Sequence, residues 1–230
     1  MQNGLQAATL FFGGWCYFVR EKVLSDDAYT LLKESIATTG HGVYISARQF
    51  ADDIGMSYTP VREAFLRLQK EGFLKQVPNV GFFVQSLDLQ DIIQIFQVRE
   101  CLEVFVLENV FDSLGDEQFS KIEDCIAEQE AAIERRDMKG NMLKDIELHE
   151  IPFALYNNPF LYELYHNVRE RYLLCSSKLV QHGSSEAILE HRNLLESMKK
   201  GDKDGAVELL LEHLANAKAR IRDGYIHYIK

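Results

Sequence analysis

The chain has 230 residues, of which 47% are hydrophobic and 26% charged, a composition typical of a globular protein with one large or two small domains. Its four cysteines stand far apart and form no C-x-x-C pair, which excludes a zinc ribbon and a disulfide framework and fits a reducing cytoplasm. The formal net charge of −10 argues against nucleic-acid binding by the whole chain, but residues 1–85 carry eight basic and eight acidic side chains, so the excess negative charge lies in residues 86–230.

Residues 1–24 contain the apolar run ATLFFGGWCYFV. This run is too short to span a bilayer and has neither a basic n-region nor a cleavage motif, so it predicts neither a membrane span nor a signal peptide. We interpret residues 1–24 as an extension, either upstream sequence read from a wrong start codon or a disordered arm, and less favourably as a segment packed on a partner subunit. Ser25 then caps a predicted helix, SDDAYTLLKESIA, and the glycine-bearing loop TTGHGVY follows it.

Residues 46–72 predict two short helices joined by a tight turn. Ser46 is a suitable N-cap with Gln49 completing a capping box, and Gly55 ends this first helix. Ser57 or Thr59 can cap the second helix. Its inward face is an apolar stripe at helical spacing, made of Val61, Ala64, Phe65 and Leu68.

Tyr58 and Arg62 are four residues apart, so they project together from another face of the second helix. The N-terminal turn of such a helix offers N–H groups to phosphate, and its projecting side chains can reach base edges in a major groove. An ordinary helical hairpin has the same spacing, so the spacing alone leaves both interpretations open.

The segment FLKQVPNVGFFVQS predicts two short paired strands around a turn at Pro78 and Asn79, which is the geometry of a wing. From residue 87 onwards strand signals disappear. Asp88 and Asp91 open a first long helix, and five more helices are predicted at 116–136, 141–156, 159–181, 186–200 and 203–224. Six helices on one core predict an antiparallel bundle, with the domain boundary near 85–88.

Polar side chains lie on three apolar helix faces of this bundle: Asp145 and His149, four residues apart, then His191 and His213. A single histidine in such a place is more often a hydrogen-bonded core residue. Because each unpaired buried polar group costs roughly 1–3 kcal/mol, four of them suggest a common partner, and a divalent ion suits three imidazoles and a carboxylate. The remaining histidines lack such company and are interpreted as surface or loop residues: His41, His166, His182 and His227.

Residues 46–72 resemble the winged-helix DNA-binding domain of the GntR family of bacterial transcription regulators, whose pattern is S-E-R-E-L-A-x-x-L-G-V-S-R-T-P-V-R-E-A-L-x-x-L-x-x-E-G-L. The matching residues are Arg48, Ala51, Gly55, Ser57, Thr59, Pro60, Val61, Arg62, Glu63, Ala64, Leu68, Glu71 and Gly72.

The chain departs from this pattern at two places on the DNA-reading side. Tyr58 replaces an arginine, and Asn79-Val80-Gly81 replaces a Gly-Arg-Gly wing tip. Both changes remove positive charge, so they change the expected operator sequence and binding strength. The resemblance predicts DNA contacts by Arg48, Ser57, Tyr58, Thr59, Arg62, Asn79 and Gly81.

The C-terminal part resembles the FCD effector domain of the FadR-like branch of this family, in which D-x-x-x-H and two later histidines hold a metal. Asp145, His149, His191 and His213 match these positions, which implies a zinc, nickel or manganese site. The family also places an arginine where this chain has Arg99, which implies a contact with a small organic acid effector. A surface ion pair of Arg99 with Glu103, worth about 0.3–0.5 kcal/mol, is the alternative.

We therefore predict a mainly α protein, with an extension at 1–24, a winged helix-turn-helix at 25–86 and an all-helical effector and dimerisation domain at 87–230. The expected function is that of a cytoplasmic, homodimeric, ligand-responsive transcription regulator, most often a repressor in this family, which binds double-stranded operator DNA and is not an enzyme. Two alternatives remain: a metal-dependent hydrolytic enzyme, in which the ion activates water, and a ligand-binding module whose DNA contacts have decayed.

Overall fold

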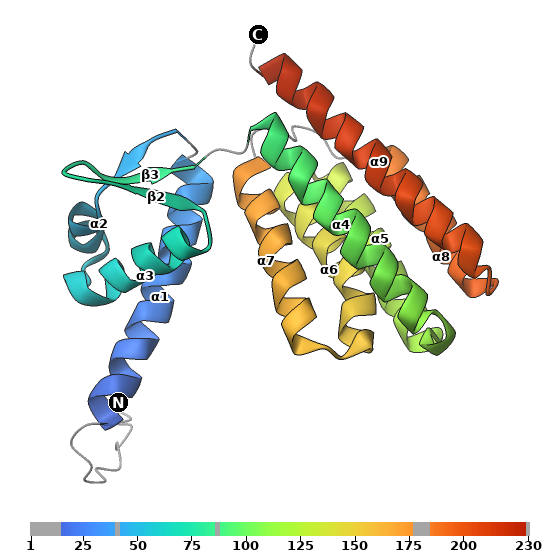
Figure 1. The fold of residues 1–230 in the computed structure, drawn as a ribbon, viewed down its shortest axis with the longest axis horizontal. Coiled ribbons are helices and arrows are strands. Elements are labelled where there is room, and N and C mark those ends of the chain that lie inside the picture. Colours follow the sequence, from blue (N-terminus) through green and yellow to red (C-terminus); the bar gives the residue numbers. More distant parts are fainter. Residues whose placement is uncertain (1–14, 40–41, 86–87, 177–184, 229–230) are drawn as a thin grey trace. The chain divides into compact units, whose positions relative to one another are not determined.

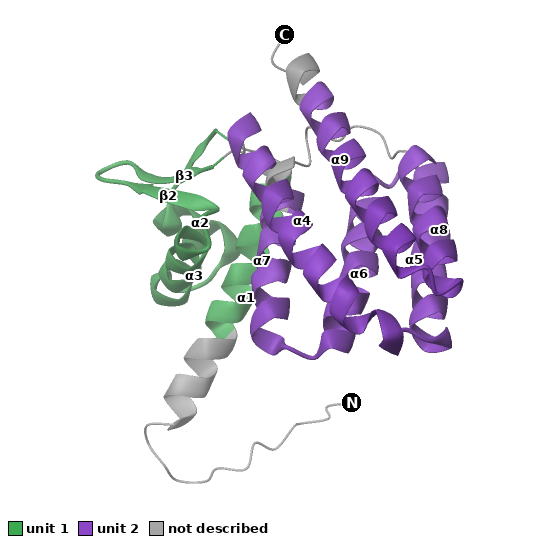
Figure 2. Ribbon diagram, turned by 45° about the vertical axis from the view of Figure 1, so that its right-hand side comes forward, with its two compact units in different colours: residues 1–85 green, residues 86–230 purple. Residues whose placement is uncertain are grey.

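The computed structural model describes residues 15–39, 42–85, 88–176 and 185–228. The chain divides into two compact units, residues 1–85 and residues 86–230 (Figure 2). None of the helices in the described ranges has both the length and the apolar content needed to cross a membrane.

The first unit begins with helix α1, Trp15–Thr39. The helix predicted to start at Ser25 therefore starts earlier, and the prediction of a cap at Ser25 is wrong. The physical reason lies in residues 15–24, WCYFVREKVL, which contain neither glycine nor proline and so do not interrupt a helix. Residues 15–24 are helical, which contradicts a disordered arm there, whereas the other two interpretations of the extension stay predictions. Residues 1–14 lie outside the described residues.

Helices α2, Ala47–Ile54, and α3, Tyr58–Lys70, form the predicted pair. The Ser46 side chain accepts a hydrogen bond from the Gln49 backbone at 3.4 Å, but the Gln49 side chain binds Asp53 at 2.8 Å, so only half of the predicted capping box forms. Gly55 ends α2 with a left-handed φ of 67°. Ser57 is the N-cap of α3 in extended conformation, without a side-chain hydrogen bond.

The predicted apolar face of α3 is buried and forms the core of the first unit. Phe65 and Leu68 are fully buried, and the Phe65 ring meets Phe82 of the sheet with 4.9 Å between centroids. Leu32 of α1 is also fully buried in this core. Because burial of one such side chain contributes about 1.5–3 kcal/mol, this face holds the opposite, polar face of α3 towards solvent.

The sheet has three antiparallel strands in the order β1-β3-β2: β1 is Tyr44–Ile45, β2 Leu74–Val77 and β3 Gly81–Val84. The predicted pairing of β2 with β3 is confirmed, with Leu74 opposite Val84. Strand β1 was expected to be part of a loop, and that expectation is wrong. Its two residues are too few to show the alternation that identifies a strand in a sequence.

The second unit is the predicted helical bundle (Figure 1). The capping box of Asp88 and Asp91 is confirmed by reciprocal bonds of 2.8 and 3.1 Å. Gly140 was expected to separate two helices, but it lies in the first turn of α6 and donates its N–H to Asp137 at 2.9 Å. The elements are α4 Leu89–Val110, η1 Phe111–Ser113, α5 Asp116–Glu134, α6 Met138–Tyr156, α7 Pro159–Ser176, α8 Ser185–Lys199 and α9 Lys203–Tyr228.

The core of this unit combines an apolar part with a polar part. Helices α4, α6 and α7 share a buried cluster that includes Val106, Phe153 and Tyr165, and the rings of Phe153 and Tyr165 stack with 4.0 Å between centroids. The inner face of α4 also carries two buried charged side chains, Arg99 and Glu103. Charged groups are rarely buried unless they are paired. The residues that pair with Arg99 and Glu103 are therefore expected to form a site.

Candidate metal centre and DNA-reading surface

The structure brings the polar residues predicted on the inner helix faces together at one point. Helix α6 contributes Asp145 and His149, α8 contributes His191 and α9 contributes His213, with one ligand atom from each within 4.8 Å of the others. The Nε2 atoms of His191 and His213 are 3.3 Å apart. Asp145 Oδ1 lies 3.5 Å from His191 Nε2 and 3.9 Å from His149 Nε2.

The second nitrogen of each imidazole meets an oxygen atom. His149 Nδ1 lies 2.8 Å from Glu103 and His213 Nδ1 lies 2.8 Å from Glu190, while His191 Nδ1 lies 3.1 Å from the Gln129 amide oxygen. Ionised carboxylates only accept hydrogen bonds, so the Nδ1 atoms of His149 and His213 carry the proton. Their Nε2 lone pairs are then directed to the shared point, the arrangement that orients histidine ligands of metals.

Burial keeps the imidazoles of His191 and His213 neutral. It lowers the pKa of His191, and the neighbouring His213 lowers it further. Burial also lowers the pKa of His213 against the opposing effect of Glu190. Burial would raise the Asp145 pKa, but the positive charge of the nearby Arg169 outweighs burial, so the Asp145 pKa lies well below its ordinary value. Neutral imidazoles and an ionised carboxylate are the protonation states that bind a metal ion.

The arrangement leaves polar atoms unsatisfied. Among the described residues, His149 Nε2 is buried and has no hydrogen-bond partner. Bonds of about 2.0–2.2 Å place two ligand atoms of one ion at most about 4.4 Å apart, so these four atoms, all within 4.8 Å of one another, fit a divalent ion after small shifts. Each unmade buried bond costs roughly 1–3 kcal/mol, and an ion would remove that cost.

Glu103 is held by more than one partner. Its Oε1 accepts from Arg99 Nε at 2.7 Å and from the Tyr165 hydroxyl at 2.8 Å. Burial would raise the Glu103 pKa, but the charge of Arg99 and the hydrogen bond from the His149 ring outweigh burial and lower it far below its ordinary value. Glu103 is therefore an anion that fixes the orientation of His149.

Arg99 was predicted either as an effector contact or as half of a surface ion pair, and the surface alternative is wrong because only 2% of the residue is exposed. A second arginine, Arg169 of α7, is fully buried and forms an ion pair with Asp145. Among the described residues, Arg99 Nη2 and the Nε and Nη1 of Arg169 are buried without hydrogen-bond partners. Two guanidinium groups beside the site therefore have unused donors, which suits an anion.

Arg169 was not identified in the sequence, although a signal existed. It stands four residues after Tyr165 and three before Tyr172, both buried, so it lies on the same helix face as two aromatic core residues. A cation on such a face indicates a buried polar site, as the histidines on apolar helix faces do.

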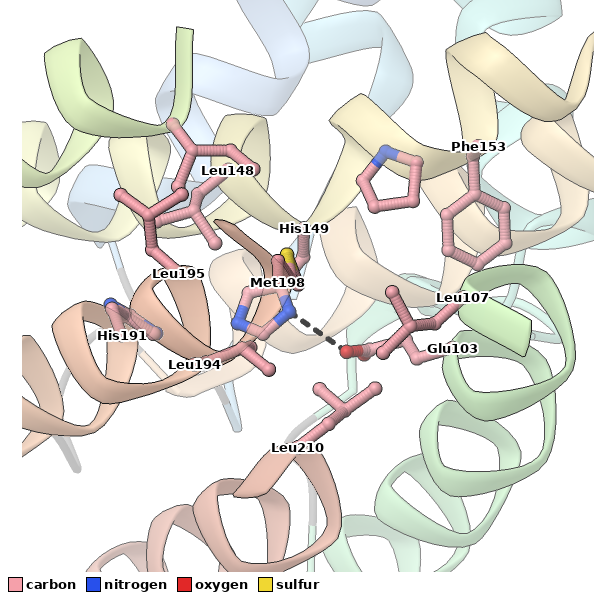
Figure 3. A pocket seen from close by; sticks show the side chains of 12 residues that line it. Glu103, Leu107, Leu148, His149, Phe153, His191, Leu194, Leu195, Met198 and Leu210 are labelled. Carbon is pink, nitrogen blue, oxygen red and sulfur yellow. Dashed lines mark ion pairs between the residues drawn. The ribbon is translucent and has the colours of Figure 1, made fainter. Parts of the chain in front are cut away.

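A cavity of about 30 Å³ adjoins the histidines. Figure 3 shows Glu103 and His149 facing each other, with Leu107, Leu194 and Leu210 around them. The polar lining of the cavity consists of Glu103, His149 and His191. Its apolar lining consists of Leu107, Ile122, Leu148, Pro152, Phe153, Leu194, Leu195, Met198 and Leu210.

The residues predicted to contact DNA lie on the surface of the first unit. Tyr58 is 45% exposed, and the guanidinium of Arg48 lies 5.8 Å from its ring centre, as in a cation–π contact. The other exposed residues of this set are Arg62, Ser57, Thr59 and Asn79.

Gly81 has a structural reason to be glycine. Its φ is 133°, and a Cβ placed there would lie 2.7 Å from the carbonyl oxygen of Ile45 in the neighbouring strand. A side chain at this position would therefore separate β1 from β3, whether or not the wing also contacts DNA.

The other histidines lie away from the cluster where they are described. His166 in α7 has a side chain that is 41% exposed and binds Glu150 at 2.7 Å, which agrees with its interpretation as a surface residue. The interpretations of His41 and His182, and of the side chain of His227, lie outside the described residues.

A winged helix-turn-helix joined to an all-helical domain defines a class of DNA-binding transcription regulators. Residues 24–84 match the family described as "Bacterial regulatory proteins, gntR family", and residues 94–216 match the "FCD domain". The chain belongs to the GntR family of bacterial transcription regulators and carries an FCD domain.

Relatives across most of the chain are named as regulators. The HTH-type transcriptional regulator YdhC of Bacillus subtilis is 30% identical over 80% of this chain and 85% of its own length. The HTH-type transcriptional repressor RspR of Escherichia coli is 20% identical over 86% of this chain and 89% of its own. The chain is accordingly a regulator and not an enzyme.

Solved structures show the same fold. McbR/YncC of E. coli superimposes with a TM-score of 0.73 at 23% identity, covering 88% of this chain and 98% of the other. The metal-free FCD domain of TM0439 gives 0.53 at 25% identity, covering 63% of this chain and 100% of the other.

Proposed function

We propose that this protein is a cytoplasmic, homodimeric repressor whose helical domain binds a divalent metal and a small organic acid, and whose winged helix binds operator DNA. The observation that supports this most strongly is the convergence of Asp145, His149, His191 and His213 within 4.8 Å.

In the proposed site, the three imidazole Nε2 atoms and Asp145 Oδ1 hold the ion, with zinc favoured and nickel or manganese also suited to this donor set. A bound ion supplies a positive pole for an acid group. Arg99 and Arg169 contribute N–H donors that have no hydrogen-bond partner among the described residues. Guanidinium binds carboxylate well because its planar donors match the two oxygens.

In the DNA-binding half, α3 enters a major groove. Arg48 and Arg62 contact phosphate or bases, Tyr58, Ser57 and Thr59 contact bases or backbone, and the wing with Asn79 and Gly81 approaches the duplex. Two such units in a homodimer match the two half-sites of a palindromic operator. The exposure of Arg48 and Arg62 supports a working DNA reader, and it disfavours the alternative in which the contacts have decayed.

The acid controls DNA binding only through a difference in affinity. If the acid binds more tightly when the two DNA-reading units cannot meet both half-sites, its binding lowers the affinity for the operator by that same factor. Release of DNA by the effector would make the protein a repressor that responds to its ligand.

Selection of bound fragments from genomic DNA tests the DNA-binding half. We expect wild-type protein to enrich a short palindromic sequence, and Arg62→Ala to lose retardation of that sequence in a gel while it remains a dimer. Arg135→Ala removes the same charge from an exposed position of the second unit and should bind like wild type. Undiminished binding by Arg62→Ala would remove Arg62 from the interface.

The selected DNA fragment also tests whether the effector controls DNA binding. We expect metal-loaded protein to release it when the effector is added, and metal-stripped protein to respond much less. A response that is identical with and without metal would contradict the role of the ion.

A further inference from the structure

The cavity beside the histidine cluster has two chemically different ends. Glu103, His149 and His191 form the polar end, and the rest of the wall is aliphatic or aromatic, without a lysine or arginine. Figure 3 shows Leu107, Leu194 and Leu210 on the side of the histidines where Glu103 lies. A ligand that reaches the cluster with its head therefore has its body against apolar side chains.

We propose that the effector is a monocarboxylic acid with a short aliphatic tail, and that this tail occupies the cavity. The inference rests on the proposed function, because the carboxylate head is placed at the ion held by the histidine cluster. It goes further by naming the class of acid that the wall selects.

The size of the cavity limits the tail. One water-sized group needs roughly 10–15 Å³, so a cavity of about 30 Å³ accepts a tail of about two or three carbon atoms. Propionate and butyrate have tails of this size. A longer chain requires side chains of the wall to move, which a packed interior resists.

The chemistry of the wall excludes more polar acids. A hydroxyl group among Leu194, Leu195 and Leu210 would lose its bonds to water and find no partner on the wall, which weakens binding by roughly 5- to 150-fold. A second carboxylate at the far end of the tail would lie against the apolar wall, which offers it no cation and no hydrogen-bond donor. Sugar acids, dicarboxylates and acids with a hydroxyl group along the tail are therefore expected to bind more weakly than short aliphatic acids.

Calorimetric titration of the full-length, metal-loaded protein with acetate, propionate, butyrate, hexanoate, 4-hydroxybutyrate, succinate and gluconate tests this proposal. Each added methylene should tighten binding about fourfold until the cavity is full, so affinity should rise from acetate to butyrate and fall at hexanoate. 4-Hydroxybutyrate should bind more weakly than butyrate, since the two differ by one hydroxyl group at the end of the tail.

A pair of variants tests whether this cavity holds the tail. Leu210 is buried and lines the cavity, whereas the adjacent Leu211 is exposed. Leu210→Ala should move the optimum to a longer acid, with hexanoate gaining relative to butyrate, and Leu211→Ala should leave the order unchanged. Circular dichroism establishes that each variant is folded, and the wild-type series tests the proposal by itself if Leu210→Ala does not fold.

The outcomes separate this inference from the proposed function. If gluconate, 4-hydroxybutyrate or succinate binds more tightly than butyrate and needs the metal, the aliphatic tail is refuted while the metal-dependent acid site stands. If affinity does not depend on chain length, the cavity does not hold the tail. If no acid and no metal binds, both the inference and the proposed effector site are refuted.

Discussion

At the residue scale, the histidines of the second unit differ in what surrounds them. His191 and His213 are buried beside other imidazoles and stay neutral, whereas His166 lies at the surface between two glutamates. Its hydrogen bonds to Glu150 and Glu170 raise its pKa to about 10. Sequence spacing distinguished the two kinds, because the buried histidines stand on apolar helix faces and His166 does not.

The raised pKa of His166 predicts a pH-dependent contribution to stability. Below about pH 6.5, the ordinary pKa of histidine, both folded and unfolded states are protonated and the contribution is complete. It is lost as pH rises towards 10, because the unfolded state then releases a proton that the folded state keeps. The effect should stay within roughly 0.2–1 kcal/mol, since the side chain is partly exposed.

Urea unfolding of wild type and His166→Gln at pH 6 and pH 10 measures this contribution. The variant should be less stable than wild type at the lower pH and nearly equal at the higher. Tyr162 does not titrate in this window, because burial and its hydrogen bond to Glu150 raise its pKa to about 12. Asn167→Ala, a change at the exposed neighbouring residue, serves as the control, and a difference that is constant with pH would contradict the assignment.

At the scale of elements, hydrophobic periodicity was sufficient for the helices and insufficient for short or irregular parts. The bundle helices and the α2–α3 pair follow from apolar stripes and capping residues. Strand β1 was not predicted, because it has only two residues. The start of α1 was predicted wrongly, because Ser25 is a good cap that the longer helix passes over. Arg169 was not predicted because its helix face carries tyrosines, which do not form a purely apolar stripe.

Helix α3 yields a prediction about DNA affinity. Tyr58→Arg restores a cation where the family pattern has one, and it should tighten binding to the selected operator. One additional phosphate contact would steepen the plot of log affinity against log salt by about 0.9. Fluorescence anisotropy between 50 and 200 mM salt measures this slope. Tyr58→Phe is the matched control, since it keeps a ring beside Arg48 without adding charge; an unchanged slope for Tyr58→Arg would place residue 58 away from the phosphates.

At the scale of the whole molecule, the chain joins a nearly neutral DNA-reading unit to an acidic effector unit. The effector unit keeps several charged and polar groups in its core, among them Arg99, Glu103 and Arg169. Buried charges are costly unless they are paired; Arg99 pairs with Glu103 and Arg169 with Asp145, and an ion at the cluster would give the buried imidazole nitrogens a partner. The sequence indicated the ligands by their spacing, but not the residues around them, because Glu103, Gln129 and Glu190 approach from three different helices.

Metal should therefore stabilise the folded chain. A ligand that binds only the folded state adds about 2.7 kcal/mol when its free concentration is a hundredfold above its dissociation constant. Thermal unfolding with added zinc should shift to higher temperature and return after chelation. The same amount of zinc should raise the unfolding temperature of His213→Ala much less.

The metal site is tested most directly by a calorimetric titration of zinc into metal-stripped protein. We expect one ion per chain for wild type, the same for His166→Ala, and strongly weakened binding for His191→Ala and His213→Ala. Equal binding by wild type and both cluster variants, or no binding by wild type, would contradict the proposed metal site.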